Sequence, residues 1–476
     1  MKLGIKIKLK EILDWTSSNV YGQGCNKDFQ NFNLASISTD TRTIEDGDFF
    51  IPVVGENYNG HDFIGDAVKQ GASGFIFESR FNDMIAGWRD KIKPGIWDNM
   101  VVLKTENNLN FLQDISHHYI RKFNPIVIGI TGSVGKTTTK DFIVSILSRV
   151  FNTKFTPKNF NTEIGISKSV LEIDKNTQFF IAELGMRANG QIGKLAKVIN
   201  LDIGAITAVG PSHLEFFKNM EEIALAKSEM ADFIAVKKGV LFLNNDDDWA
   251  DFIEKRTKCK VLKFGRNNSL DFNFLEKDMD EYGKFSFGFY KNKKKLAEIN
   301  LPVSGYHNLY NACCAAAICS FLKLEPEIIR EGIENAVLEN RRMEVGRKGD
   351  KIIINDCYNA SPLSMKKAID TLKLVASKNK GRSVVILADM LELGNESERL
   401  HFEIGQYLKE KNIGLVVVVG KLSKKICCGF LPNKSHYFDD KKNLGSKLQS
   451  FLKAGDVILI KGSRANRLES LLDFIN

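Results

Sequence analysis

The chain has 476 residues, of which 43% are hydrophobic and 26% charged, and its formal net charge is +9. A chain of this length exceeds one ordinary hydrophobic core, so we expect two to four domains, with the composition of a soluble globular protein. The basic excess suits an anionic ligand, but it is spread along the chain without the basic block of a nucleic-acid-binding arm, so we expect no nucleic-acid partner.

The first 15 residues alternate lysine with apolar residues. They contain neither an uninterrupted apolar segment nor a small-residue cleavage site, so we expect no signal peptide. No apolar run approaches the roughly 18–20 residues of a membrane-spanning helix. The adjacent pairs Cys313–Cys314 and Cys427–Cys428 lie in apolar stretches without a C-x-x-C spacing, which favours buried, reduced thiols. We expect a cytoplasmic monomer without membrane insertion.

Three blocks of predicted elements follow one another along the chain. Residues 1–100 mix short strands with turns, and a polar helical stretch near 107–122 follows them. In residues 101–330, strand-like runs such as QFFIAEL, IGAITAV and GVLFLNN alternate with helical patterns. In residues 331–476, the runs KIIIND, RSVVILADM, GLVVVVG and DVILIKGS alternate with helices in the same way. We therefore predict an α/β protein of three domains with these boundaries, in which helices cover mainly parallel sheets.

The glycine-rich segment GITGSVGKTT, residues 129–138, joins a predicted strand to a predicted helix. Gly132 and Gly135 permit backbone angles that turn N–H groups toward an anion, and the helix dipole adds to that attraction. Lys136 can reach the β- and γ-phosphates of a nucleotide, and the hydroxyl of Thr137 can bind Mg²⁺. The alternative is a glycine-rich turn with an incidental lysine. The strand–loop–helix context favours phosphate binding.

The predicted helix after this loop has its apolar residues on one face. These residues are Phe142, Ile143, Ile146, Leu147 and Val150.

Several polar residues near the ends of the next predicted elements are candidates for the same site. Glu183 ends a buried strand and is well placed for Mg²⁺, although a surface glutamate is commoner. His213 follows the next strand, where a lone histidine is more often structural. Lys227 has the pattern of a solvent-facing helix lysine. Asn308 and Asn311 begin an alanine-rich helix, where helix capping and recognition of a nucleotide base are both open.

Taken together, these segments resemble the Mur ligase family of ATP-dependent enzymes, which add amino acids to the peptidoglycan precursor. The phosphate loop of that family has the form T-G-[TS]-x-G-K-[TS]-[TS]. The matching residues here are Thr131, Gly132, Ser133, Val134, Gly135, Lys136, Thr137 and Thr138. The other motifs of the family follow in the expected order, at Asn161, Glu183, His213, Lys227, Asn308 and Asn311.

The resemblance implies roles for these positions. It implies that Thr137, Glu183 and His213 help to hold two Mg²⁺ ions, and that Asn308 and Asn311 lie near the adenine of ATP. It implies that Lys227 is carbamylated and becomes a further metal ligand, because an ordinary ammonium group would repel Mg²⁺. Lys136, Lys227, Arg342 and Lys461 are the expected catalytic residues, and Asp356 is a further expected ATP-binding residue.

The two ends of the chain indicate the branch of the family. The C-terminal segments INDCYNASPLSM, LADMLELG and KGSRANRLE are similar to those of the branch that adds D-alanyl-D-alanine to UDP-N-acetylmuramoyl-tripeptide. The N-terminal segments STDTRTIEDGDFF and GENYNGHDF are similar to its UDP-sugar-binding domain. The resemblance therefore implies a UDP-sugar-binding domain, a central ATP-binding domain and a C-terminal Rossmann-like domain. The implied substrate-binding residues are Asp40, Thr41, Arg42, Gly60, His61, Asn161, Tyr358 and Asn359.

Two departures from the family pattern are Arg341, where a glycine is usual, and Thr162, where a second asparagine is common. The implied reaction forms an amide bond through an acyl phosphate, in which Lys136, Mg²⁺ and Arg342 balance the developing charge. Two alternatives stay open at this point. One is a ligase of the same fold that adds the diamino acid, and the other is a nucleotide-gated switch that catalyses no ligation.

Overall fold

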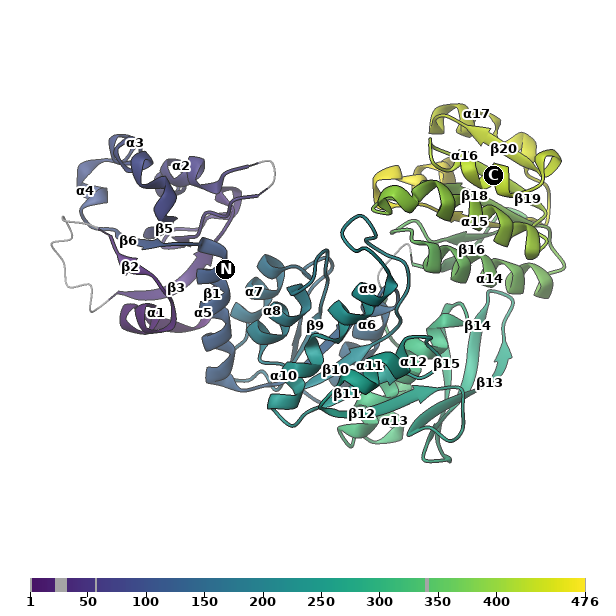
Figure 1. Ribbon diagram of the computed structural model, residues 1–476, viewed down its shortest axis with the longest axis horizontal. Coiled ribbons are helices and arrows are strands. Elements are labelled where there is room, and N and C mark those ends of the chain that lie inside the picture. The colour runs from purple at the N-terminus through teal and green to yellow at the C-terminus, as the bar shows by residue number, and fades with distance from the viewer. Residues whose placement is uncertain (1, 22–31, 56–57, 339–341, 476) are drawn as a thin grey trace. The chain divides into compact units, whose positions relative to one another are not determined.

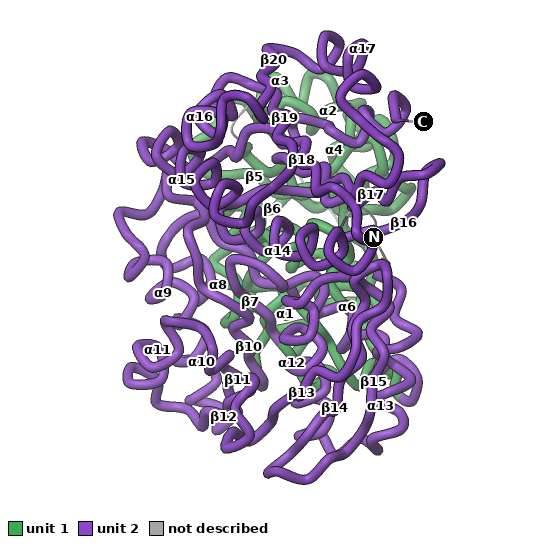
Figure 2. The backbone as a smooth tube through the Cα atoms, turned by 90° about the vertical axis from the view of Figure 1, so that its right-hand side faces the viewer, with its two compact units in different colours: residues 1–128, 151–182, 194–201 green, residues 129–150, 183–193, 202–476 purple. Residues whose placement is uncertain are grey.

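The computed structural model describes residues 2–21, 32–55, 58–338 and 342–475. The chain divides into two compact units, shown in two colours in Figure 2. The first unit comprises residues 1–128, 151–182 and 194–201, and the second comprises residues 129–150, 183–193 and 202–476. Three sheets occur in chain order, as Figure 1 shows, and the predicted three-domain α/β fold is confirmed. The domain boundaries near residues 100 and 330 stay a prediction.

The N-terminal sheet has the strand order β1-β3-β4-β5-β6-β2. Its strands are β1 (Lys2–Lys8), β2 (Asn19–Val20), β3 (Asn33–Ser38), β4 (Phe49–Phe50), β5 (Gly74–Glu78) and β6 (Val101–Thr105). Strands β3 to β6 run parallel, while the outer strands β1 and β2 are antiparallel to their neighbours. Helices α1 (Leu9–Trp15), α2 (Ile64–Lys69), α3 (Ile85–Lys91) and α4 (Pro94–Trp97) accompany it. Large aromatic side chains such as Phe50, Phe75 and Trp88 form its core.

The central sheet has the order β15-β14-β13-β12-β11-β10-β7-β9-β8. Its strands are β7 (Ile126–Thr131), β8 (Thr153–Phe155), β9 (Phe179–Glu183), β10 (Ile203–Ile206), β11 (Val240–Asn244), β12 (Lys260–Gly265), β13 (Phe272–Met279), β14 (Lys284–Lys291) and β15 (Lys294–Ser304). Strands β10 to β13 are parallel, and β13, β14 and β15 form an antiparallel meander at one edge. The predicted strands QFFIAEL, IGAITAV and GVLFLNN are confirmed as β9, β10 and β11.

Nine helices of the described chain belong to this middle part. They are α5 (Asn108–Phe123), α6 (Lys136–Leu147), α7 (Glu163–Leu171), α8 (Gln191–Ile199), α9 (Met220–Ser228), α10 (Met230–Val236), α11 (Ala250–Arg256), α12 (His307–Phe321) and α13 (Pro326–Glu334). The polar helix predicted near 107–122 is confirmed as α5. The apolar face predicted for α6 was wrong at its end, because the helix stops at Leu147 and the Val150 side chain is 46% exposed.

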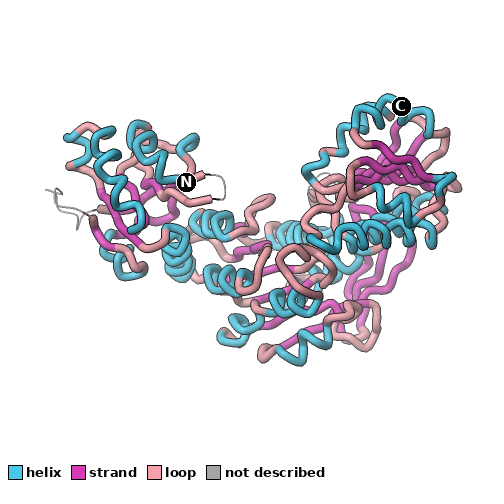
Figure 3. Tube along the Cα trace, turned by 45° about the horizontal axis from the view of Figure 1, so that its top comes forward, coloured by secondary structure: helices cyan, strands magenta, loops and turns pink. Residues whose placement is uncertain are grey.

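The C-terminal sheet has the order β16-β17-β21-β18-β19-β20. Its strands are β16 (Glu344–Lys348), β17 (Lys351–Asn355), β18 (Ser383–Ala388), β19 (Leu415–Val419), β20 (Ser435–Phe438) and β21 (Val457–Lys461). All of them run parallel except β16. Helices α14 (Pro362–Lys378), α15 (Ser397–Glu410), α16 (Lys424–Gly429) and α17 (Lys441–Phe451) lie on either side of the sheet (Figure 3). The predicted strands of this block are confirmed.

The cysteines of the described chain are all free. Cys313 and Cys314 are buried in α12, as expected, whereas Cys427 is half-buried and Cys428 is exposed. The prediction of burial was wrong for the second pair, because α16 is a short helix near the surface rather than a core element. No helix within the described ranges has the length and apolar character needed to cross a membrane.

Candidate active site

The turn between β7 and α6 has the backbone of a phosphate-binding loop. Gly132 and Gly135 have φ angles of 151° and 87°. A Cβ atom at Gly132 would collide with the hydroxyl of Thr207, and one at Gly135 with the side-chain amide of Asn311. Both positions therefore require glycine for conformation and for space. The consequence is a narrow loop whose N–H groups precede a helix N-terminus, the arrangement that binds phosphate.

Lys136, the first residue of α6, lies over this loop. Its Nζ donates a hydrogen bond of 2.8 Å to the carbonyl oxygen of Gly132. Burial lowers the pKa of Lys136 and the positive charge of Arg342 acts in the same direction, while Glu183 opposes them. Burial disfavours the charged form of Lys136, and a bound phosphate would stabilise that charged form again.

Thr137 and Glu183 form a contact at the ends of two elements. Thr137 Oγ1 donates a 2.6 Å hydrogen bond to Glu183 Oε2, and both residues are only 3% exposed. A hydroxyl and a carboxylate oxygen are ligands that Mg²⁺ accepts. The described residues include no group of three or more His, Cys, Asp or Glu side chains placed to hold a metal. This donor set fits Mg²⁺ shared with substrate phosphates, because that ion is commonly bound by one or two carboxylates plus phosphate oxygens.

His213 lies after β10 in the left-handed backbone region, with φ of 56°. Its Nδ1 is 2.7 Å from Oε2 of Glu392, which belongs to the loop after β18. Burial lowers the pKa of His213, the negative charge of Glu392 opposes this, and Lys136 and Lys227 reinforce it. The imidazole therefore lies within the field of the two candidate lysines. Glu392 lies in the segment LADMLELG, which the sequence analysis compared with the family branch, but its contact with His213 was not predicted from the sequence.

Lys227 is buried in α9, with 2% of its surface exposed. Burial lowers the pKa of Lys227 well below that of an ordinary lysine, the positive charge of Lys136 contributes, and Asp247 opposes it. The alternative of a solvent-facing helix lysine is therefore excluded, and the expected burial of Lys227 is confirmed. Its proposed carbamylation stays a prediction, and the lowered pKa of Lys227 favours the neutral amine that this reaction needs.

Asn308 and Asn311 form a buried amide pair at the start of α12. Asn311 Nδ2 donates a 2.8 Å hydrogen bond to Asn308 Oδ1, and Asn308 Nδ2 donates a 2.7 Å bond to the carbonyl oxygen of Ser304. Because Asn311 also lies against Gly135, the pair is next to the phosphate loop.

The candidate residues of the C-terminal sheet lie at the ends of β17 and β21. Lys461 Nζ is 2.5 Å from Asp356 Oδ2 and donates a 2.8 Å hydrogen bond to the carbonyl oxygen of Asn359. Arg342 stacks on Tyr358, with its guanidinium carbon 3.7 Å from the ring centroid. The arginine that neighbours Lys136 electrostatically is thereby held on an aromatic face.

The candidate sugar-binding residues of the N-terminal sheet include an ion pair. Arg42 clasps Asp40 with bonds of 2.9 Å from Nε and 2.7 Å from Nη2, and this lowers the pKa of Asp40 to about 2. Thr41 begins the short 3₁₀ turn Thr41–Thr43, which includes Arg42 and has Asp40 as its N-cap. The side chain of Arg42 is 85% exposed and can still meet an anion.

Gly60 and His61 have structural surroundings. A Cβ atom at Gly60 would meet the backbone of Val53, so the chain approaches too closely for any other residue. His61 is fully buried, and its Nε2 accepts a 3.1 Å bond from the N–H of Glu78 while Nδ1 lies 2.9 Å from Asn59 Oδ1. Burial lowers the pKa of His61 to about 4, so this imidazole is neutral. Direct contact of either residue with substrate stays a prediction.

Asn161 precedes α7, where Thr162 is the N-cap and its hydroxyl accepts a bond from the N–H of Gly165. The unusual threonine at this position therefore serves helix capping. Arg341 lies outside the described residues.

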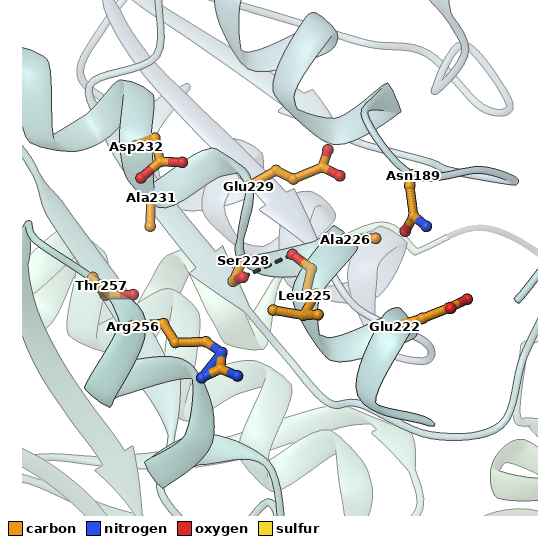
Figure 4. Close-up of a pocket in the computed structure, with 10 residues that line it drawn as sticks. All are labelled: Asn189, Glu222, Leu225, Ala226, Ser228, Glu229, Ala231, Asp232, Arg256 and Thr257. Carbon is orange, nitrogen blue, oxygen red and sulfur yellow. Dashed lines mark hydrogen bonds between the residues drawn. The ribbon is translucent and has the colours of Figure 1, made fainter. Parts of the chain in front are cut away.

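A second depression, of about 360 Å³, lies over α9, α10 and α11 (Figure 4). Its lining includes the carboxylates of Glu222, Glu229 and Asp232. Both oxygens of Glu229 accept backbone N–H groups, from Gly190 at 2.6 Å and Gly193 at 2.9 Å. This carboxylate is used at the N-terminal turn of α8, and an acidic lining does not suit nucleotide phosphates.

Comparisons with known proteins agree with this geometry. Residues 130–319 match the Mur ligase middle domain, and residues 341–464 match the Mur ligase glutamate ligase domain. A protein of Bacillus subtilis named UDP-N-acetylmuramoyl-tripeptide–D-alanyl-D-alanine ligase is 31% identical over 95% of both chains. A crystal structure of MurF from Acinetobacter baumannii is 26% identical, with a TM-score of 0.88 over 99% of both chains. The structure of MurF ligase from Thermotoga maritima in complex with ADP is also 26% identical, with a TM-score of 0.79, covering 92% of this chain and 96% of that one.

Proposed function

This chain belongs to the Mur ligase family, and on that premise we propose that it joins D-alanyl-D-alanine to UDP-N-acetylmuramoyl-tripeptide in an ATP-dependent reaction. The product is a precursor of peptidoglycan, and the enzyme forms a C–N bond. The observation that carries the proposal is the meeting of Lys136, Thr137 and Glu183 at a glycine-shaped loop. That arrangement lies in a chain that aligns along nearly its whole length with ligases of this name.

The reaction needs activation, because a peptide carboxylate does not react with an amine at neutral pH. A carboxylate oxygen of the tripeptide attacks the γ-phosphorus of ATP, and ADP leaves. The amine of D-alanyl-D-alanine then attacks the acyl carbon, phosphate departs with the carboxylate oxygen, and the nitrogen loses a proton. Catalysis of this kind depends on positioning and on charge neutralisation.

The side chains support this sequence in distinct ways. Lys136 and Arg342 are proposed to balance charge on the transferring phosphoryl group, and the buried Asn308–Asn311 pair to bind the adenine. Thr137, Glu183, His213 and a carbamylated Lys227 are proposed to hold Mg²⁺. When bound, Mg²⁺ would neutralise the phosphate oxygens and align them for transfer. The C-terminal sheet would supply four further residues. Asp356 is proposed to bind ATP, Tyr358 and Asn359 to bind substrate, and Lys461 to act in catalysis.

The N-terminal unit is proposed to bind the UDP-sugar through Asp40, Thr41, Arg42, Gly60, His61 and Asn161. Of these, Arg42 offers the best-supported contact, since its side chain is largely exposed although it also holds Asp40. We further propose that the enzyme is a monomer and works in the cytoplasm, where its co-substrate ATP is available. Light scattering coupled to size-exclusion chromatography would measure the mass in solution.

Product mass tests the function. The protein is incubated with ATP, D-alanyl-D-alanine and UDP-N-acetylmuramoyl-tripeptide, using tripeptides that end in L-lysine or in meso-diaminopimelate. The expected product has the summed mass of the two substrates less one water, with one ADP and one phosphate per product. Nucleotide hydrolysis without a new product would indicate a switch, and turnover only with the dipeptide precursor and a free diamino acid would indicate the other ligase. Either result would contradict the proposal.

A further inference from the structure

The carboxylate of Glu392 lies between two loops of the central sheet. Its Oε2 is 2.7 Å from Nδ1 of His213, in the loop after β10. Its Oε1 is 3.3 Å from Nη2 of Arg187, in the loop after β9. The carbonyl oxygen of Glu392 also accepts a long 3.5 Å bond from the N–H of Glu215. One residue of the C-terminal sheet thus contacts both loops that follow the candidate metal-binding strands.

The loop that carries Glu392 is fixed to the C-terminal sheet by its backbone. The N–H of Met390 donates a 2.9 Å hydrogen bond to Nε2 of the buried His401. The N–H of Leu391 donates a 3.0 Å bond to the hydroxyl of Ser463, which is also buried. Because neither bond uses the side chain of Glu392, the carboxylate is presented to His213 from an ordered support.

Both partners have a backbone conformation that L-residues rarely adopt. The φ angle is 62° at Glu392 and 56° at His213. Left-handed conformations of residues other than glycine and asparagine persist when the surroundings enforce them, and they concentrate at functional sites. Both residues of this contact therefore have a backbone conformation that their surroundings must enforce.

The contact decides which ring nitrogen of His213 remains available. Nδ1 is buried and makes no well-aligned hydrogen bond within the described part of the chain, so the Glu392 carboxylate at 2.7 Å is the group that faces it. A neutral imidazole that carries its proton on Nδ1 has its lone pair on Nε2. Histidines that bind a ligand through one nitrogen are commonly oriented by a carboxylate at the other.

We propose that Glu392 is a positioning residue, which holds His213 with its Nδ1 proton toward the C-terminal sheet and its Nε2 lone pair toward the phosphate loop. This inference rests on the proposed function and deepens it. It also couples the C-terminal sheet to the assembly of the site, because the carboxylate reaches His213 only when these parts are in contact. Arg187 fixes the second oxygen and restricts rotation of the carboxylate.

The first test replaces Glu392 in three ways. Glu392→Gly and Glu392→Asn remove the carboxylate yet suit the left-handed backbone, so loss of folding cannot explain their phenotype. Both should lower kcat by about 10- to 100-fold, with little change in KM for the UDP-sugar substrate. Glu392→Gln keeps an oxygen acceptor and should recover part of kcat. The matched control is Glu396→Gln, which lies at the end of the same loop and pairs with Arg399 instead.

A double-mutant cycle asks whether Glu392 acts through His213. If it does, adding Glu392→Gly to His213→Ala should cost less than twofold beyond His213→Ala alone, since coupled residues are not additive. A second loss as large as that seen in the wild-type background would show that Glu392 acts on something else. That result, or wild-type kcat in Glu392→Gly, would overturn the proposal.

Nitrogen NMR of the histidine rings supplies a readout that does not depend on activity. In the ligand-free protein, the ring of His213 should show the Nδ1–H tautomer, and Glu392→Gly should shift its two nitrogen resonances toward exchange averaging. Identical His213 spectra in the two proteins would contradict the proposal. If the wild-type protein forms no ligated product, the proposed function fails, whereas the NMR result still decides whether Glu392 sets the tautomer.

Discussion

Lys461, at the end of β21, and Lys227, in α9, are buried to the same extent in two regions of the molecule, each with 2% of its surface exposed. Lys461 has an anion of its own chain, since Asp356 Oδ2 lies 2.5 Å from its ammonium group. Lys227 has no carboxylate within ion-pair distance among the described residues, and burial lowers its pKa strongly. A buried charge that its own chain satisfies should contribute to stability whatever its part in the reaction, whereas one left without a close partner should contribute to the reaction alone.

Among the lysines expected to act in the reaction, replacement of Lys136 should have the largest effect on kcat. Lys136→Ala should lower kcat for ligation by about 10³-fold or more, because a positioned cation is lost from the phosphoryl-transfer site. The free energy of unfolding should change little, since within the described part of the chain the side chain donates a hydrogen bond to the carbonyl of Gly132 alone. Steady-state kinetics with denaturant titration would measure both. Ligation near the wild-type rate at saturating ATP would contradict the proposed part of the phosphate loop in phosphoryl transfer.

The structural side is tested next by Lys461→Met. This change should lower the free energy of unfolding by about 3 kcal/mol, because it leaves Asp356 without its partner in a mostly buried place. Adding Asp356→Leu should restore much of that loss, since removing both charges is far milder than removing one.

A matched control for Lys461 is Lys351→Met. Lys351 is also buried, but its partner Asp350 is 54% exposed and water can replace the lysine. The expected loss there is below about 1 kcal/mol. Equal losses in Lys461→Met and Lys351→Met, measured by denaturant titration, would contradict the assignment of Lys461 to the fold.

Replacement of Lys227, in contrast to Lys461, should affect the reaction and not the stability of the fold. Lys227→Ala should lower kcat by about 100-fold, and short carboxylic acids such as formate or acetate should restore part of the activity by occupying the space of a carbamate. The modification adds carbon dioxide to the neutral amine and releases one proton, which turns a neutral group into an anion. Lys227→Met, which preserves volume, should not destabilise the protein, since it removes a buried charge.

The control for this experiment is Lys218→Ala, a change of an exposed lysine just before α9. It should alter neither kcat nor the response to carboxylic acids. Full activity of Lys227→Ala without any added acid would show that the buried amine has no part in the reaction.

The smallest expected effect concerns His61, a buried group satisfied by its own chain in the N-terminal unit. Because burial lowers its pKa to about 4, against 6.5 for an ordinary histidine, the unfolded chain binds the proton first as pH falls. The stabilising contribution is complete above pH 6.5 and is lost as pH falls toward 4. We expect a loss of about 1 kcal/mol between pH 7 and pH 5 after allowing for solvent screening.

The variant His61→Gln isolates this contribution. It should be less stable than the wild type at pH 7 and should show a flatter dependence of unfolding free energy on pH over the same range. Parallel pH profiles of the two proteins would mean that another group produces the wild-type slope.

These regions also show which features of the structure could be predicted from the sequence. The strand–loop–helix around Gly132, Gly135 and Lys136 was predictable because its geometry and its residue types are local in the chain. The end of α6 was not, since the apolar spacing continues to Val150 while the backbone turns after Leu147. The neutrality of His61 could not be predicted either, because it results from tertiary burial, and the N–H that bonds to its Nε2 belongs to Glu78, 17 residues away.

The contact of Glu392 with His213 was beyond prediction for a related reason, although the segment LADMLELG that contains Glu392 was identified in the sequence. Its partner His213 belongs to a different sheet, and the loop that presents it depends on bonds to His401 and Ser463. The depressed pKa of Lys227 likewise results from tertiary burial, which a helix pattern alone does not reveal. The chemistry of a local motif could therefore be predicted from the sequence. The charge state of each group could not, because it depends on neighbours that are distant in the chain.

In the proposed reaction, phosphoryl transfer activates the carboxylate before the amine attacks. The most direct measurement uses tripeptide substrate labelled with ¹⁸O in both oxygens of its terminal carboxylate, incubated with ATP, D-alanyl-D-alanine and the protein. If the reaction proceeds through an acyl phosphate, we expect one labelled oxygen in the released inorganic phosphate for each amide bond formed, and none in ADP. Ligated product accompanied by unlabelled phosphate would contradict it.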